Sequence, residues 1–214
     1  MNYLSHAVIA AEFSPVALFV LGSMLPDFAN MLRVPLPRLE ETQLQDGVRF
    51  HHRTDAVFHD LPSFVELNQQ ALHELRERSV SRGPSRATAH IGIEMLIDAI
   101  LAEDPVGMQA YSAALRAGAS TDAIWAPLPT TEIKRVRRLL EHLAEGGKEL
   151  HAASAARLSE RIGHALAGRP RLEPTALELG VISNFCAGFT EEVRGKMPRI
   201  WQDLRAGLLV GERV

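Results

Sequence analysis

The amino-acid sequence predicts an all-α fold, a helical bundle formed as a single domain over residues 1–214. Polar residues recur at every fourth position in two places, and this spacing brings side chains onto one face of an α-helix. Proline and glycine stand at intervals that suit helix starts and stops. No segment sustains the alternation of apolar and polar residues that is typical of a half-buried β-strand. With 46% apolar residues, the chain can build a sizeable core.

The N-terminal segment predicts two apolar helices and a loop. Residues 3–12 form the first helix. Ser14 followed by Pro15 indicates an N-cap and a first helical position, so a second helix is expected to begin there. Pro26 is expected to interrupt this second helix, because proline lacks the amide hydrogen and its ring clashes with the preceding turn. Residues 31–41 are expected to form a loop.

Two longer helices carry the fourth-residue repeats. The first is expected from about Glu40 to His59, and a further helix follows over 61–78. A polar turn is expected at 81–84. The second repeat lies on a helix over 85–103, within an almost wholly apolar stretch.

The rest of the chain predicts four helices. They cover 105–118, 132–145, 150–167 and about 174–209, and the glycine pair at 146–147 is expected to end the second of them.

Charge and cysteine content exclude several classes of function. The net charge is −3 and the pI about 6.3, so the chain lacks the electrostatic footprint of a nucleic-acid-binding protein. The only cysteine, Cys186, excludes an internal disulfide and a thiolate zinc site. The apolar stretch over 7–25 has no basic segment before it and is interrupted by polar residues, so we expect neither a signal peptide nor a membrane span. A cytoplasmic protein is the expectation.

The first repeat consists of His51, Asp55 and His59. Their spacing places them on one face of a helix, and all three are metal-ligand types. A solvated helix surface would instead pair Glu or Asp with Lys or Arg at this spacing, and no basic residue interrupts the repeat. A divalent metal site is therefore predicted.

The second repeat consists of His90, Glu94 and Asp98. Because its surroundings are apolar, the carboxylates are expected to be buried, and a buried charge needs a partner. A metal ion is one such partner, and a buried Arg53 is the alternative. His6 and Asp27, also in apolar surroundings, complete a predicted set of eight ligands around one cavity that holds one or two divalent ions.

The predicted metals are manganese, iron or zinc, because the donors mix carboxylates with imidazoles. Such a site indicates hydrolysis of a phosphate ester. His52 points about 100° away from His51 on a helix, so we expect His51 to be the ligand. His52 or Arg53 is then available to contact the substrate phosphate, and His52, Arg53 or His59 to protonate the leaving group. Four other histidines are expected at the solvated surface: His73, His142, His151 and His164.

Several motifs resemble the acyl carrier protein phosphodiesterase family, whose members are helical and are distant relatives of the HD-domain phosphohydrolases. They are the opening Asn2-Tyr3-Leu4-Ser5-His6, the segment Leu21-Gly22-Ser23-Met24-Leu25-Pro26-Asp27-Phe28, Gly47-Val48-Arg49-Phe50-His51 with Arg53, Asp55 and Leu61-Pro62, and the acidic helix around Ile93-Glu94-Met95-Leu96-Ile97-Asp98. The resemblance is specific over residues 2–102.

The resemblance implies an HD-domain-like fold and a metal-dependent, usually manganese-assisted, enzyme that releases 4′-phosphopantetheine from holo acyl carrier protein. The matching motif positions are His6, Asp27, His51, Asp55 and Asp98. The chain departs from the family pattern at Ala99, where a histidine is usual, at His52, where a basic residue is usual, and at His59, where an acid or hydroxyl residue is usual. An acidic carrier protein would need a basic rim, for which the candidates are Arg33, Arg38, Arg49, Arg53, Arg82 and Arg86.

Two alternatives remain. The order of His6, Asp27, His51, Asp55, His59, His90 and Glu94 is similar to that of the zinc-dependent phospholipase C and P1 nuclease group, whose members are secreted. A non-catalytic helical protein with a structural metal is the other alternative. The sequence does not distinguish the natural substrate, the metal or the oligomeric state.

Overall fold

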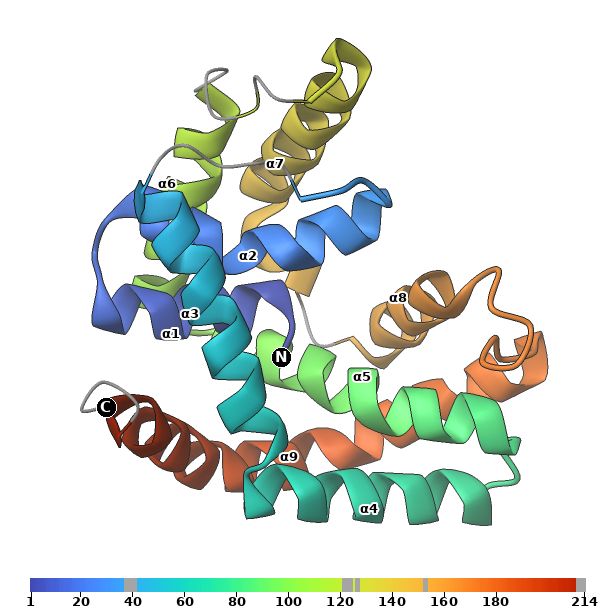
Figure 1. Ribbon diagram of the computed structural model, residues 1–214. Helices are drawn as coiled ribbons and strands as arrows, with labels where there is room; N and C mark the ends of the chain where they lie inside the picture. The colour runs from blue at the N-terminus through green and yellow to red at the C-terminus, as the bar shows by residue number, and fades with distance from the viewer. Residues whose placement is uncertain (37–41, 121–124, 126–127, 152–153, 211–214) are drawn as a thin grey trace. The chain divides into compact units, whose positions relative to one another are not determined.

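A computed structural model describes residues 1–36, 42–120, 125, 128–151 and 154–210 of the chain, and its described residues form helices and no strands (Figure 1). The predicted all-α fold is confirmed. The helices are α1 (Tyr3–Phe13), α2 (Ala17–Leu32), α3 (Thr42–His59), α4 (Pro62–Glu77), α5 (Arg82–Leu101), α6 (Pro105–Ser120), α7 (Thr130–His151), α8 (Ala155–Leu166) and α9 (Ala176–Val210).

The chain divides into two compact units. Unit 1 comprises residues 1–55 and 101–151, and unit 2 comprises residues 56–100 and 152–214. Each unit is assembled from two separate stretches of chain. The expectation of one domain over the whole chain stays a prediction.

Unit 1 is built around α1 and α2, which pack against each other and against α6, while α7 packs on α6 and α2 (Figure 1). These contacts follow from the apolar character of α1 and α2. The core of the unit includes Leu4, Ile9, Leu21, Met24, Phe28, Tyr111, Leu115 and Leu140, all of which are at most 2% exposed. Apolar burial of this kind is the main favourable contribution to folding.

Two glycines allow α2 and α3 to cross at close range. A Cβ atom added to Gly22 would lie 2.9 Å from the Cα of Gly47, and one added to Gly47 would lie 2.7 Å from the Cα of Gly22. Carbon atoms pack best at about 3.5–4.0 Å, so any side chain at either position would push the helices apart. Ser23 follows directly after Gly22, and His51 lies one turn beyond Gly47. The glycine crossing therefore brings these two residues together.

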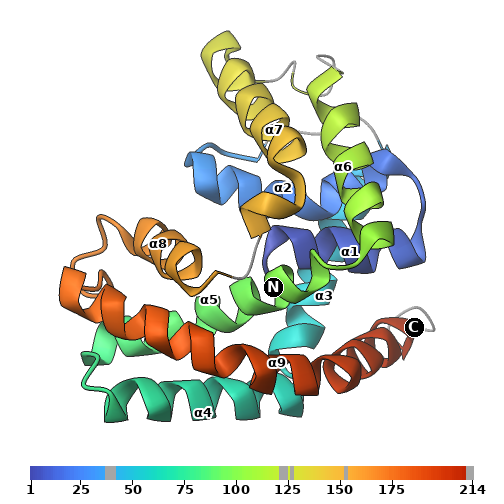
Figure 2. The same cartoon turned by 180° about the vertical axis from the view of Figure 1, so that it is seen from behind.

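Unit 2 is organised around the long helix α9, which packs against α4 and α8 (Figure 2). A capping box begins α9: the amide of Thr175 donates to the Glu178 carboxylate at 2.8 Å, and the amide of Glu178 donates to the Thr175 hydroxyl at 3.2 Å. The apolar core of the unit includes Phe58, Leu67, Leu75, Ile93, Leu96, Ile162, Phe185, Val193 and Leu204.

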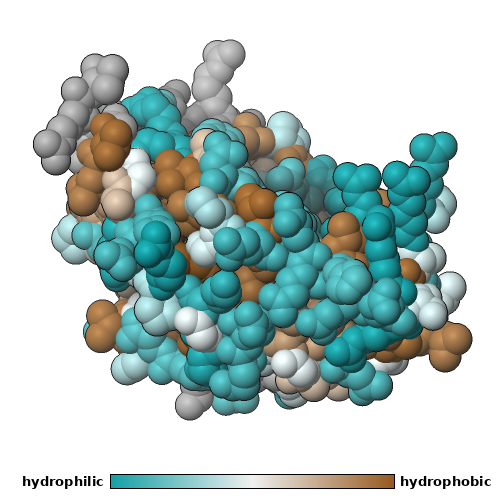
Figure 3. Space-filling view, turned by 90° about the horizontal axis from the view of Figure 1, so that it is seen from below, coloured by the Kyte–Doolittle hydropathy of each residue, from teal (hydrophilic) through white to brown (hydrophobic). Residues whose placement is uncertain are grey.

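The surface that Figure 3 shows from below is mainly hydrophilic, with hydrophobic side chains scattered over it. Isolated apolar residues such as Val65 and Leu177 are exposed in unit 2, which is normal for a folded chain. Within the described residues, no helix has both the length and the apolar character needed to cross a membrane.

The prediction that Pro26 interrupts the second helix is wrong. Helix α2 begins at Ala17, with Val16 and not Ser14 at its N-cap, and continues through Pro26 to Leu32. Proline costs the helix one hydrogen bond, but Met24, Leu25 and Phe28 on either side are buried. The burial of these apolar side chains stabilises the helix despite the missing backbone hydrogen bond.

Three other boundaries differ from the sequence prediction. Helix α5 begins at Arg82, inside the expected polar turn, because Gly83 and Pro84 fit its first turn, where proline is tolerated. Gly147 has a positive φ of 48° and leaves helical geometry, as expected for a glycine at the end of a helix. However, the chain returns to helical geometry after Gly147 and continues as α7 to His151. Part of the predicted loop over 31–41 is helical, and residues 37–41 lie outside the described part of the chain.

Candidate metal centres

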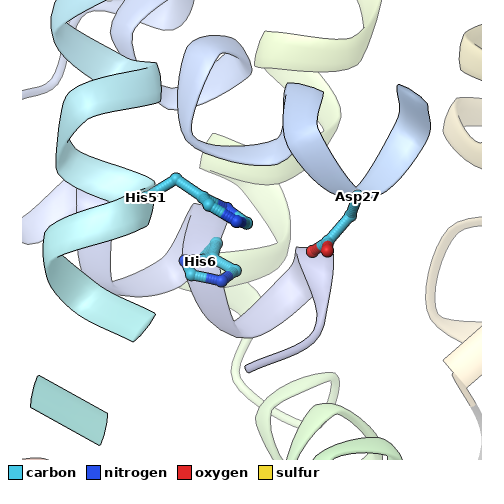
Figure 4. Close-up of side chains that lie close together, drawn as sticks. All are labelled: His6, Asp27 and His51. Carbon is cyan, nitrogen blue, oxygen red and sulfur yellow. The ribbon is translucent and has the colours of Figure 1, made fainter. Parts of the chain in front are cut away.

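Three helices of unit 1 bring His6, Asp27 and His51 together. His6 comes from α1, Asp27 from α2 and His51 from α3, and the Asp27 carboxylate points toward the two stacked imidazoles (Figure 4). One ligand atom from each residue lies within 4.8 Å of the others. The two rings stack with their centroids 3.9 Å apart, and both histidines are buried. These residues could hold a divalent ion.

The hydrogen bonding of His51 prepares it for metal binding. Its Nδ1 lies 2.8 Å from the carbonyl oxygen of Ser23, which can only accept, so Nδ1 carries the proton. Burial, and secondly the nearby His6, lower the pKa of His51 to about 3. The ring is therefore neutral near pH 7, and its Nε2 keeps a lone pair. Metal-binding histidines are commonly oriented by a carbonyl in this way.

Asp55 adds a carboxylate beside the same two histidines. Its Oδ1 lies 3.1 Å from His6 Nε2 and 2.6 Å from the N-terminal ammonium of Met1, and its Oδ2 lies 3.5 Å from His51 Nε2. Burial acts to raise the pKa of Asp55, but the hydrogen bond with His6 and the ammonium charge outweigh it and hold this pKa well below its usual range. Asp55 is therefore ionised and orients His6.

A second ligand group lies within unit 2. It consists of His59 at the end of α3 and of His90 and Glu94 on α5, again with one ligand atom of each within 4.8 Å of the others. The Nε2 atoms of His59 and His90 each lie 3.2 Å from Glu94 Oε1. Burial acts to raise the pKa of Glu94, whereas the hydrogen bond with His59 acts to lower it.

Seven of the eight predicted ligands therefore lie in or beside a ligand group. Each group is described within its own unit, so the expectation of one shared cavity stays a prediction. Asp98 is fully buried on α5 and belongs to neither group found among the described residues. The structure buries His51 and exposes His52, which agrees with the expected register, while Arg53 is half-buried. The roles of these three residues stay predictions.

Sequence reasoning missed the residues that position the ligands. Ser23 joins three helices, since its carbonyl accepts from His51 and its hydroxyl donates to the carbonyl oxygens of His6 and Val20. Gly22, inside the apolar helix α2, was an indirect signal for a close approach of another helix next to Ser23. The expectation that His151 is a surface residue is wrong: it is fully buried, with its ring against Tyr3 and Tyr111.

The donor sets fit divalent cations. Each group has two imidazoles and a carboxylate, which suits zinc, iron and manganese better than calcium or magnesium. In the unit 1 group the two histidines are buried and Asp27 is partly exposed, whereas in unit 2 both His59 and His90 are partly exposed. Comparison of the chain with protein-family models, with curated proteins and with solved structures finds no match.

Proposed function

We propose that this chain is a metal-dependent phosphodiesterase that uses the His6, Asp27 and His51 group of unit 1. The convergence of these three residues, from three helices, onto one small volume supports the proposal most strongly. They occupy motif positions of the family that the sequence resembles, and the glycine crossing and the Ser23 carbonyl orient them. Residues that serve only packing would not need a neutral, oriented imidazole beside an ionised carboxylate.

A bound divalent ion would supply Lewis-acid activation of water and charge neutralisation at phosphorus. His6, Asp27 and His51 would hold the ion, and Asp55 would keep His6 oriented. His52, which is exposed on α3, would protonate the leaving alkoxide, and Arg53 would contact a phosphate oxygen. Manganese, iron and zinc all fit this donor set.

The proposed substrate is holo acyl carrier protein, which would lose 4′-phosphopantetheine. This choice depends on the family resemblance. Docking of an acidic carrier needs basic residues, and Arg33 and Arg49 in unit 1 and Arg82 and Arg86 in unit 2 are exposed. Of the other two candidates, Arg53 is half-buried and Arg38 lies outside the described residues.

The test incubates the metal-loaded full chain with holo acyl carrier protein and measures the mass of the carrier. We expect the mass to fall by that of the phosphopantetheine group, and we expect a chelator or His51→Ala to prevent the loss. His73→Ala, which removes an exposed histidine from α4, is the control and should leave the reaction unchanged.

Hydrolysis of bis-p-nitrophenyl phosphate by the same preparations separates the alternatives. Turnover of this diester without any change in the carrier would favour another substrate, such as those of the zinc-dependent phospholipase C and P1 nuclease group. A full complement of metal without turnover of either substrate would favour a structural metal.

A further inference from the structure

The ligand group of unit 2 directs three side chains toward one point. The rings of His59 and His90 stack with centroids 5.0 Å apart and only 13° between their planes. Both rings direct Nε2 toward the same oxygen of Glu94. Two imidazoles and one carboxylate that converge in this way are a donor set that zinc-type ions take.

The distances fit a tetrahedral ion. The Nε2 atoms of His59 and His90 each lie 3.2 Å from Glu94 Oε1. For a tetrahedral zinc with bonds of about 2.0–2.1 Å, neighbouring ligand atoms lie roughly 3.3 Å apart. A zinc-type ion thus fits both of these ligand pairs with little movement of the side chains.

The group also has an open side. The side chain of Glu94 is 11% exposed, but those of His59 and His90 are 33% and 45% exposed. A cavity of about 340 Å³ adjoins the two histidines and is lined by Phe64, Val65, Asn68, Gln69 and the histidines themselves. Catalytic zinc sites have three protein ligands and an open fourth position, whereas structural sites are closed by four ligands.

We propose that unit 2 binds a zinc-type divalent cation of its own through His59, His90 and Glu94, with a fourth position that opens into this cavity. All three ligands belong to unit 2, so the site needs no ligand from the unit 1 group. The inference therefore goes beyond the proposed function and does not depend on it.

The cavity defines the class of ligand that this ion would take. Phe64 supplies an apolar wall, with its ring 5.4 Å from that of His59 and 5.7 Å from that of His90. Asn68 and Gln69 on α4 supply amide donors and acceptors. A small molecule with an anionic or carbonyl oxygen for the metal and a polar group for these amides fits this lining, and the volume is at the lower end of the range for small-molecule sites.

The first experiment counts bound metal. The full chain is stripped with chelator, loaded with zinc, desalted and analysed for zinc per chain, alongside His90→Ala, Glu94→Gln and the control His73→Ala. We expect His90→Ala and Glu94→Gln each to bind one equivalent fewer than the unaltered chain and His73→Ala to bind the same number. Equal zinc content in all four proteins would overturn the proposal. The unit 1 site is tested separately by His51→Ala, so the two outcomes are distinguishable.

A second experiment uses the unaltered chain and does not depend on the folding of any variant. Diethyl pyrocarbonate modifies accessible histidines, and peptide mass spectrometry locates the modification. We expect zinc to reduce modification of His59 and His90 at least tenfold while exposed His73 is modified equally with and without zinc. Equal modification of His90 in both conditions would contradict the proposal. Cobalt in place of zinc tests the open position in His51→Ala, which lacks the unit 1 ion. Added azide should change the visible spectrum of cobalt in this variant, and the further substitution His90→Ala should abolish the change. An unchanged spectrum in His51→Ala would contradict an open position.

Discussion

Gly47→Ala is expected to damage the unit 1 metal site without touching a ligand. The added Cβ would lie 2.7 Å from Gly22 Cα, where carbon atoms prefer about 3.5–4.0 Å, so α2 and α3 must separate by roughly 1 Å. His51 and Ser23 lie on the two helices just beyond this contact. Their 2.8 Å hydrogen bond would lengthen to roughly 3.8 Å, which exceeds hydrogen-bonding distance.

The expected cost follows from these changes. Overpacking a helix contact costs about 1–3 kcal/mol, and loss of a buried hydrogen bond adds about 1 kcal/mol. The better helix propensity of alanine offsets about 1 kcal/mol. We therefore expect Gly47→Ala to lower the free energy of unfolding by about 1–3 kcal/mol in urea titrations of the metal-free chain. Metal affinity at the unit 1 site should fall about 10–100-fold, because His51 loses the carbonyl that orients it.

Gly188→Ala is the matched control. Gly188 is an exposed glycine in α9, and no atom from outside its own helix lies near the place of an added Cβ. The substitution should stabilise the chain by about 0.5–1 kcal/mol, because it makes the same change in helix propensity without a clash. If Gly47→Ala is as stable as Gly188→Ala and binds metal with unchanged affinity, the role assigned to the glycine crossing is wrong.

Three further predictions concern ionisation and helix capping. In the metal-free chain, lowering the pH from 7.5 to 5 should reduce the free energy of unfolding by about 2 kcal/mol through His51, because the unfolded state binds a proton near pH 6.5 that the folded state, with a pKa of about 3, does not. In urea titrations, the free energy of unfolding of His51→Gln should fall less over the same pH range. Equal falls in the variant and the unaltered chain would refute the assignment of this pH dependence to His51. Burial raises the pKa of Cys186 to about 12, so Ellman's reagent at pH 8 should react with it only after unfolding, and rapid reaction with the native chain would contradict its burial. Thr175→Ala should lower the free energy of unfolding by about 1 kcal/mol through loss of the α9 capping box, whereas Thr175→Ser should keep most of it; equal urea midpoints for the two variants would contradict the capping role.

The sequence predicted the helical class well because helix periodicity and turn residues are local signals. The fourth-residue repeat also predicted which of two adjacent histidines faces inward, and His51 is buried while His52 is exposed. The error at Pro26 arose because the effect of proline on a helix depends on tertiary packing as well as on the local sequence. Proline removes one hydrogen bond, but burial of the neighbouring side chains keeps the helix continuous.

The site was predictable in its ligand types but not in its grouping. A four-residue spacing joins side chains over one turn of helix, whereas eight residues rise about 12 Å. The repeat therefore predicts a common helix face and not a common point in space. The backbone carbonyl of Ser23 and the contact between Gly22 and Gly47 depend on how helices cross, and a single sequence contains no direct signal for that.

The central claim is that the His6, Asp27 and His51 group binds a divalent ion. The most direct test is to measure metal per chain in His51→Ala and His52→Ala, since these neighbouring histidines differ in burial and in contact with the group. The structure of unit 1 predicts that His52→Ala retains all the metal of the unaltered chain and that His51→Ala, with its helical content intact by circular dichroism, loses one equivalent. Full metal content in both variants would contradict the claim.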